Sequence, residues 1–294
     1  MKKKISKKEG IEKNKIIKLK RLANKVRIKI LKMAVKLGVG HIAPSFSCTE
    51  ILIACYFGGI LSLNLKDFKK NKKDYFIMSK GHASMALYVV LAEKGFISKK
   101  SLSNFSKKGS KLGVHAENVI AGVETFTGSL GHGLSLGAGL ALAAKLDKKE
   151  YLSLVLMGDG ECYEGSVWEA AMFASDYRLD NLITIIDHNG FSATAPLKNS
   201  LEVNSLKKKW KSMGWDTVIV DGHSFEELLS VLKNISLRRS AKPLAIIALT
   251  TKGKGVSFME NNPIWHYRAP KGEELKIACC ELKIKNKGYD EKLG

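Results

Sequence analysis

The stretch Leu152-Ser-Leu-Val-Leu-Met-Gly-Asp-Gly160 decides the fold of this chain, together with Leu182-Ile-Thr-Ile-Ile-Asp-His-Asn-Gly190 further on. Each begins as a short apolar run, which is typical of a buried strand in a parallel sheet, and ends in glycine and polar residues. Residues 166–177, between the two runs, carry a helical pattern. A strand, a helix and a second strand in this order predict one unit of a parallel sheet.

The same alternation extends along the chain. Apolar residues from Leu19 to Leu37 recur at helical spacing and predict an amphipathic helix. Another helix is expected from Ser224, which has Glu227 at the spacing of a capping box. We expect an α/β fold: a doubly wound, mostly parallel sheet with helices on both faces. Further strands are predicted at 75–78, 217–220 and 244–249, and helices at 134–146 and 224–237.

We expect a basic flexible tail at 1–15, one domain at 16–272 and a C-terminal extension at 273–294.

Composition argues against several classes of protein. No apolar run is long enough to span a membrane. The basic start is not followed by the apolar segment of a secretory signal. The five cysteines show no paired spacing, so neither a disulfide framework nor a zinc site is expected, and a cytoplasmic location is favoured.

The net charge of +21 raises the question of nucleic-acid binding. Residues 1–36 contain fifteen Lys and Arg against two Glu, which is more than half of the excess. Only six of the 49 basic residues are Arg, the side chain suited to bidentate phosphate and base contacts. We therefore expect no specific nucleic-acid site.

Polar residues follow four of the predicted strands, at the edge where open α/β sheets bind ligands. Asp159 and Asn189 stand on neighbouring turns of this kind, so their oxygen atoms can reach one point. A carboxylate, an amide oxygen and a backbone carbonyl suit Mg²⁺, which completes its shell with phosphate oxygens and water. The sequence thus predicts a clamp for a metal and a diphosphate. The four segments are Ser79-Lys80-Gly81-His82, Gly158-Asp159-Gly160, Asp187-His188-Asn189-Gly190 and Asp221-Gly222-His223.

These motifs resemble those of the transketolase family, over about residues 20–272. Gly158-Asp-Gly160 followed by Asn189 resembles the motif that binds thiamine diphosphate. Residues 158–165 resemble GDGxxxEG, 122–133 resemble GVExxTGxLGQG, 79–84 resemble SxGHxS and 40–44 resemble GHPGAP. Residues 252–262, with Trp265 and His266, resemble the end of the cofactor domain in short, split transketolases.

The resemblance implies roles for individual residues. Asp159, Asn189 and the backbone oxygen of Phe191 would hold Mg²⁺. The diphosphate would contact His82, His266 and the Gly158–Gly160 turn, and the cofactor rings would contact Gly128 and Leu130. His41 and His115 would line the substrate channel and bind sugar hydroxyls. Glu164 would lie near a subunit interface, in the hydrogen-bond network between active sites, and His41, His115, His266 and Glu164 would be the catalytic residues. Structural roles are expected for His132, His188, His223, Glu124 and Asp187.

Three departures from the family pattern bear on the substrate. Ile42 and Ala43 replace the usual Pro-Gly. Ala193 replaces an Ile that normally packs on the thiazolium ring, and Tyr267 replaces the usual Gly after His266.

The resemblance also implies that this chain needs a partner. The glutamate that activates the cofactor belongs to a pyrimidine-binding domain, and this sequence ends at Gly294. We expect the partner to be a C-terminal transketolase subunit, in an α2β2 assembly, with sugar phosphates as substrates. Alternatives are a split transketolase for a non-standard ketose or secondary metabolism, the α subunit of a 2-oxo-acid dehydrogenase, and a non-catalytic scaffold or nucleic-acid-binding subunit.

Overall fold

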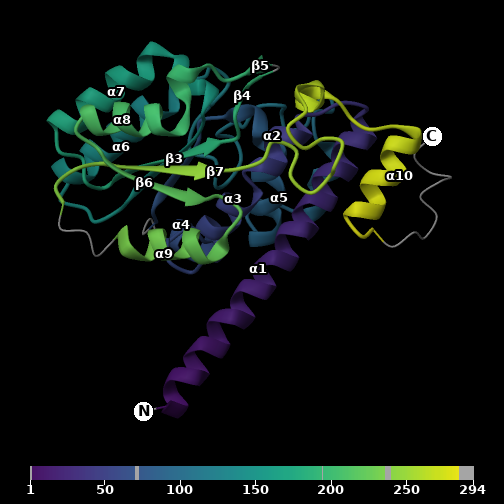
Figure 1. Ribbon diagram of the computed structural model, residues 1–294, viewed down its shortest axis with the longest axis horizontal. Coiled ribbons are helices and arrows are strands. Elements are labelled where there is room, and N and C mark those ends of the chain that lie inside the picture. Colours follow the sequence, from purple (N-terminus) through teal and green to yellow (C-terminus); the bar gives the residue numbers. More distant parts are fainter. Residues whose placement is uncertain (1, 70–72, 194, 236–239, 285–294) are drawn as a thin grey trace.

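The computed structural model is built on a five-stranded sheet (Figure 1). Its strands are β1 (Tyr75–Met78), β2 (Ser153–Gly158), β3 (Leu182–His188), β6 (Asp216–Asp221) and β7 (Leu244–Leu249). They stand in the order β1-β2-β3-β7-β6, and every neighbouring pair is parallel. Their carboxyl ends therefore lie at one edge. The structure describes residues 2–69, 73–193, 195–235 and 240–284, with side chains from residue 13 onward.

Helices cover both faces of this sheet (Figure 1). On one face Val155 and Met157 pack against α6 (Gly133–Leu146), α7 (Gly165–Asp176) and α8 (Val203–Ser212). On the other face Leu154 and Leu156 pack against α1 (Lys2–Leu37), α3 (Thr49–Phe57), α5 (Ser84–Lys94) and α9 (Phe225–Ile235). Alternate side chains of a strand point to opposite faces, so each strand serves both cores. The predicted doubly wound α/β fold is confirmed.

Shorter elements complete the chain. They include three helices, α2 (Ile42–Ser47), α4 (Leu65–Lys69) and α10 (Gly272–Glu281), and a hairpin of β4 (Phe191–Ser192) and β5 (Ala195–Pro196). The 3₁₀ turns are η1 (Gly81–Ala83), η2 (Lys99–Asn104), η3 (Gly160–Tyr163), η4 (Asn199–Leu201) and η5 (Pro263–Tyr267).

The start of α9 forms only half of the predicted capping box. The Ser224 hydroxyl accepts a hydrogen bond from the Glu227 amide at 3.2 Å. The Glu227 carboxylate, however, accepts from the amide of Asp221 at 2.9 Å. The Ser224 amide is already used, since it donates to the Asp221 carbonyl at 3.1 Å. The end of the predicted helix, at 236–237, lies outside the described residues.

Both ends of the chain differ from the sequence predictions. Helix α1 begins at Lys2, so helix replaces the predicted flexible tail over residues 2–15. This segment is rich in good helix formers and contains no proline. At the other end, Ala278 and Leu282 are buried in the same core as α1, and Asn24 donates to the Leu282 carbonyl at 3.0 Å. Residues 273–284 thus belong to the domain, and 285–294 lie outside the described residues.

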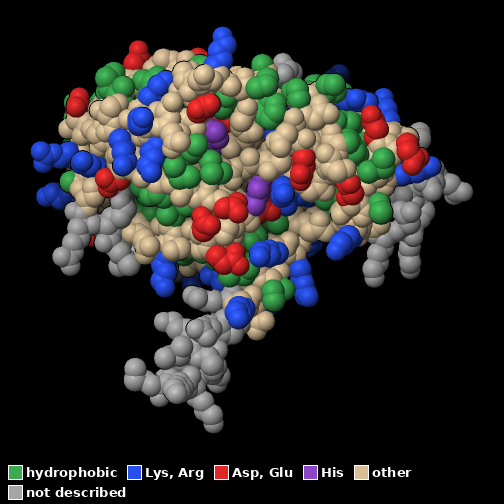
Figure 2. All heavy atoms as spheres, in the orientation of Figure 1, with side chains coloured by type: hydrophobic (Ala, Val, Ile, Leu, Met, Phe, Trp, Pro, Cys, Tyr) green, Lys and Arg blue, Asp and Glu red, His purple; other side chains and the backbone are tan. Residues whose placement is uncertain are grey.

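Among the described side chains on the face seen in Figure 2, Lys and Arg are interspersed with Asp and Glu. Among the described residues, no helix is both long and apolar enough to cross a membrane.

Candidate active site

A cavity of about 240 Å³ lies at the carboxyl edge of the sheet, where the loops after β1, β2, β3 and β7 meet. Most of the site residues predicted from the sequence line it. Two are not among the lining residues: His41, whose ring lies against the lining histidines, and Glu164, which is exposed at the start of α7. The predicted residues that line the cavity are His82, His115, Gly128, Leu130, Gly158, Asp159, Gly160, Asn189, Phe191 and His266.

Asp159 ties two neighbouring turns together. One carboxylate oxygen accepts from the Gly160 amide at 2.8 Å, and the other accepts from the Gly190 amide at 2.6 Å. Asn189, next to Gly190, accepts from the Phe191 amide at 3.2 Å through its side-chain oxygen. Burial raises the pKa of Asp159 to about 6, because a buried carboxylate is costly without a cation beside it. The turns after β2 and β3 thus present oxygen atoms from both sides to one cavity.

Four histidines gather beside these oxygen atoms. The ring of His41 is 5.3 Å from His82, 5.3 Å from His266 and 6.4 Å from His115, between centroids. Burial, with the nearby cations, lowers the pKa of His41 to about 3 and that of His266 to about 4. Burial also lowers the pKa of His82 well below its ordinary value. These three imidazoles are therefore neutral at pH 7, and each offers one donor and one acceptor.

A buried ion pair of Lys80 and Asp187 lies beneath the cavity, with at most 1% of either side chain exposed. The Lys80 ammonium donates to Asp187 and to the Pro44 carbonyl, the latter at 3.0 Å. Hydroxyls of Ser47 and Thr250 also donate to Asp187. Burial alone would raise the pKa of Asp187, but Lys80 and these donors outweigh it and hold this pKa below its ordinary value. Asp187 therefore holds Lys80, which lines the cavity, in place.

Lys252 brings a second cation to the cavity wall. Its ammonium donates to the Ala193 carbonyl and lies 5.4 Å from the centre of the Phe191 ring. Burial and the charge of Lys80 lower the pKa of Lys252 to about 8. Ala193 has a φ of 50°, a left-handed conformation that is uncommon outside glycine and tends to occur at functional sites.

Glu161 is a third residue without a predicted role. Its carboxylate accepts from the amides of Gly131 at 2.8 Å and Gly158 at 3.1 Å, and from the Ser79 hydroxyl. It therefore joins the loop at Gly131 to the turns after β1 and β2. Lys80, Lys252 and Glu161 all sit in loops that follow predicted strands, and this position was the signal that could have identified them.

Other polar residues have the structural roles that the sequence predicted. His223 contacts Glu50 through Nδ1 at 2.9 Å, and its Nε2 accepts from the Thr251 amide at 2.9 Å. This arrangement fixes the loop after β7. Glu124 forms an ion pair with Lys73 at 2.6 Å. Two further histidines contact backbone carbonyl oxygens: His132 and His188.

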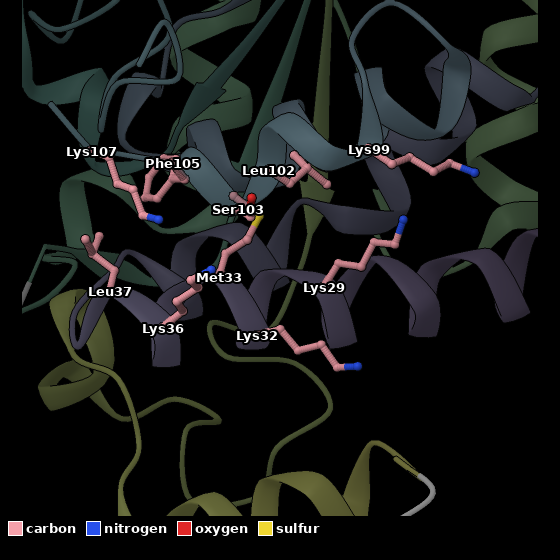
Figure 3. A pocket seen from close by; sticks show the side chains of 10 residues that line it. All are labelled: Lys29, Lys32, Met33, Lys36, Leu37, Lys99, Leu102, Ser103, Phe105 and Lys107. Atoms are coloured by element: carbon pink, nitrogen blue, oxygen red, sulfur yellow. The ribbon is translucent and has the colours of Figure 1, made fainter. Parts of the chain in front are cut away.

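A larger pocket, of about 370 Å³, lies between α1 and η2 (Figure 3). Its floor is apolar, with Met33, Leu102 and Phe105, and lysines stand around it. The residues that line it include no carboxylate or imidazole. Most of the site residues predicted from the sequence line the smaller cavity.

Comparison with known proteins identifies the family. Residues 18–290 match the family model described as the thiamine diphosphate binding domain of transketolase. The chain belongs to the transketolase family. It is 40% identical over 260 residues to one of the subunits of the apulose-4-phosphate transketolase of Phocaeicola vulgatus, an alignment that covers 88% of this chain and 92% of that protein. The 6-deoxy-6-sulfo-D-fructose transketolase subunit of a Clostridium species is 36% identical over 90% of this chain and 96% of that protein.

Longer transketolases match over part of their length. Human transketolase is 40% identical over 84% of this chain, which is 39% of the human protein. The solved transketolase of Campylobacter jejuni superposes with a TM-score of 0.81 and 29% identity, over 90% of this chain and 42% of that one. This transketolase-family chain therefore spans about two fifths of both proteins.

The cavity of this transketolase-family chain fits a diphosphate with a divalent cation. No atom lies within 4 Å of the place where a Cβ on Gly128 or Gly158 would stand, so the backbone leaves room there. Nδ1 of His266 is buried without a hydrogen-bond partner. Among the described residues, no cluster of three His, Cys, Asp or Glu could hold a metal, so a cation at Asp159 and Asn189 would need further oxygens from its ligand and water. A Mg²⁺-diphosphate supplies them.

Proposed function

We propose that this chain is the N-terminal, cofactor-binding subunit of a two-chain transketolase, which transfers a two-carbon ketol unit between sugar phosphates. The observation that carries the proposal is one cavity in which Asp159 and Asn189 face a cluster of neutral histidines. Thiamine diphosphate, when bound, would supply a stabilised carbanion, and the protein would supply binding and orientation.

One set of residues in this chain would bind the cofactor, and another set would bind the substrate. Asp159, Asn189 and the backbone oxygen of Phe191 would hold Mg²⁺. His82, His266 and the Gly158–Gly160 turn would hold the diphosphate, and Gly128 and Leu130 would contact the cofactor rings. Lys252 adds positive charge at the wall of the same cavity, which favours an anion, whereas the charge of Lys80 is matched by Asp187.

His41 and His115 would bind the hydroxyls of the sugar. A hydroxyl both donates and accepts, so a neutral imidazole can satisfy it on either side. Two relatives act, by their names, on apulose 4-phosphate and 6-deoxy-6-sulfo-D-fructose, which are sugars with an anionic end. Sugar phosphates, the standard transketolase substrates, share this anionic end and remain the proposed substrates, and a non-standard ketose is the alternative.

A partner chain with the pyrimidine-binding domain would complete the site, in an α2β2 assembly. Relatives that this chain covers over 92% and 96% of their length are themselves named as subunits. Large apolar side chains close to the cavity-lining residues in sequence, Phe126 and Ile264, are 58% and 65% exposed, as expected of a surface that a partner covers. Glu164, exposed at the start of α7, would lie near this interface.

A ketol-transfer assay tests the proposal. The chain co-purified with its partner should transfer the ketol unit, and the chain alone should not. His115→Ala and His266→Ala should slow the transfer while size-exclusion chromatography shows the assembly intact. Strong turnover by the chain freed of any partner would overturn the two-chain site. Decarboxylation of a 2-oxo acid in place of ketol transfer would favour a dehydrogenase subunit.

A further inference from the structure

Tyr267 lies against His41 on the outer side of the histidine cluster. Their ring centroids are 4.5 Å apart and their planes are tilted by 48°. The other rings around His41, those of His82, His115 and His266, all line the cavity, whereas Tyr267 does not. Tyr267 is 46% exposed. His41 is thus enclosed between the cavity histidines and a tyrosine that faces solvent.

The surroundings of His41 favour its neutral form. Burial is the largest cause of its lowered pKa of about 3, followed by the charges of nearby cations. Apart from Tyr267, whose phenol is neutral or anionic, the titratable groups that face it are cationic when charged: His82, His115, His266, Lys80 and Lys252. The ring of Tyr267 is packed against His41, with 4.5 Å between the two centroids, so it contributes to this burial.

We propose that Tyr267 is a positioning residue for His41: its ring covers the outer side of the imidazole, excludes water from it and holds it against the cavity. Because the transketolase pattern usually has glycine at this position, this chain supplies a cover that the pattern lacks. The role in catalysis rests on the proposed function, in which His41 binds a sugar hydroxyl. The contact with His41 does not depend on that function.

An NMR titration of the full chain tests the contact without any turnover. The pKa of His41, assigned through His41→Gln, would be measured in the natural chain, in Tyr267→Gly and in Tyr267→Phe. We expect Tyr267→Gly to raise the pKa of His41 by at least about one unit, because water reaches the ring. Tyr267→Phe, which keeps the ring, should leave it unchanged. An unchanged pKa in Tyr267→Gly, or a raised pKa in Tyr267→Phe, would overturn the proposal.

Kinetics of the reconstituted enzyme test the consequence. Tyr267→Gly should raise the KM for the ketose roughly tenfold, the effect of about 1.4 kcal/mol in binding. Tyr267→Gly should retain the kcat near pH 8 and the affinity for the cofactor. Tyr267→Phe should have the same KM for the ketose as the natural chain. A residue with only a structural role would instead lower the urea midpoint of the chain and leave the KM unchanged. If the natural pair shows no ketol transfer, the proposed function fails, and the NMR titration still decides the role of Tyr267.

Discussion

Gly158→Ala offers a sharp test of where the cofactor lies. Gly158 ends β2 and lines the cavity, and no atom stands within 4 Å of an added Cβ. Its φ is not positive, so alanine fits the backbone, and the free chain should be unchanged or slightly more stable. A diphosphate that approaches this backbone would meet the new methyl. Overpacking of this kind costs roughly 1–3 kcal/mol, which weakens binding roughly 5- to 150-fold.

Calorimetric titration of thiamine diphosphate with excess Mg²⁺, on the chain together with its partner, measures the effect. Gly139→Ala is the matched control, because Gly139 is also open to an added Cβ but is exposed in α6, away from the cavity. It should stabilise the chain by about 0.8–1 kcal/mol and leave the cofactor affinity unchanged. Natural affinity in Gly158→Ala would refute the inference that the diphosphate packs on this turn.

Three further predictions follow from charged and titratable groups. Asp159→Ala should abolish binding of thiamine diphosphate, and a chelator should abolish it in the natural chain. Calorimetry measures the binding, and an unchanged affinity in either experiment would contradict the metal-diphosphate clamp. Lys80→Met should lower the free energy of unfolding in urea by about 3–5 kcal/mol, because it leaves Asp187 charged and buried, whereas Lys145→Met, at an exposed ion pair, should cost less than about 1 kcal/mol. His41 and His266 stay neutral in the folded chain as the pH falls below 6.5, whereas the same residues take up protons in the unfolded chain. The urea midpoint should therefore decrease as the pH is lowered from 6.5 to about 4. A double variant with glutamine at both positions should show a smaller decrease.

The predictable part of the fold is the part with a regular pattern. Short apolar runs gave the strands β2, β3 and β7 within two residues of their ends. Helices α3 and α5 were not predicted, because most of their residues are buried all round and leave no polar face to set a helical period. The hairpin of β4 and β5 has only two residues in each strand, too few for an alternation to be visible.

The candidate site also has a part that the sequence predicts and a part that it does not. Asp159 and Asn189 could be predicted to meet because parallel strands end at one edge, and this follows from strand order alone. The burial of Lys80, Glu161 and Lys252 could not be predicted, since a lysine or glutamate in a loop is usually solvated. Their partners come from elements distant in sequence, such as Asp187 for Lys80. Their position after predicted strands is visible in the sequence, but only the packed structure shows that they are buried.

One charged ligand would account for the burial of these ionisable groups around the cavity. Burial raises the pKa of Asp159 and lowers that of Lys252, so each is pushed towards its neutral form. His41 and His266 are neutral as well, while Lys80 is matched by Asp187. A cation at the oxygen atoms of Asp159 would favour its carboxylate, and an anion near Lys252 would favour its ammonium. A cation and an anion bound together would relieve both groups, and a metal diphosphate carries both charges, whereas a neutral ligand would leave the two groups as they are.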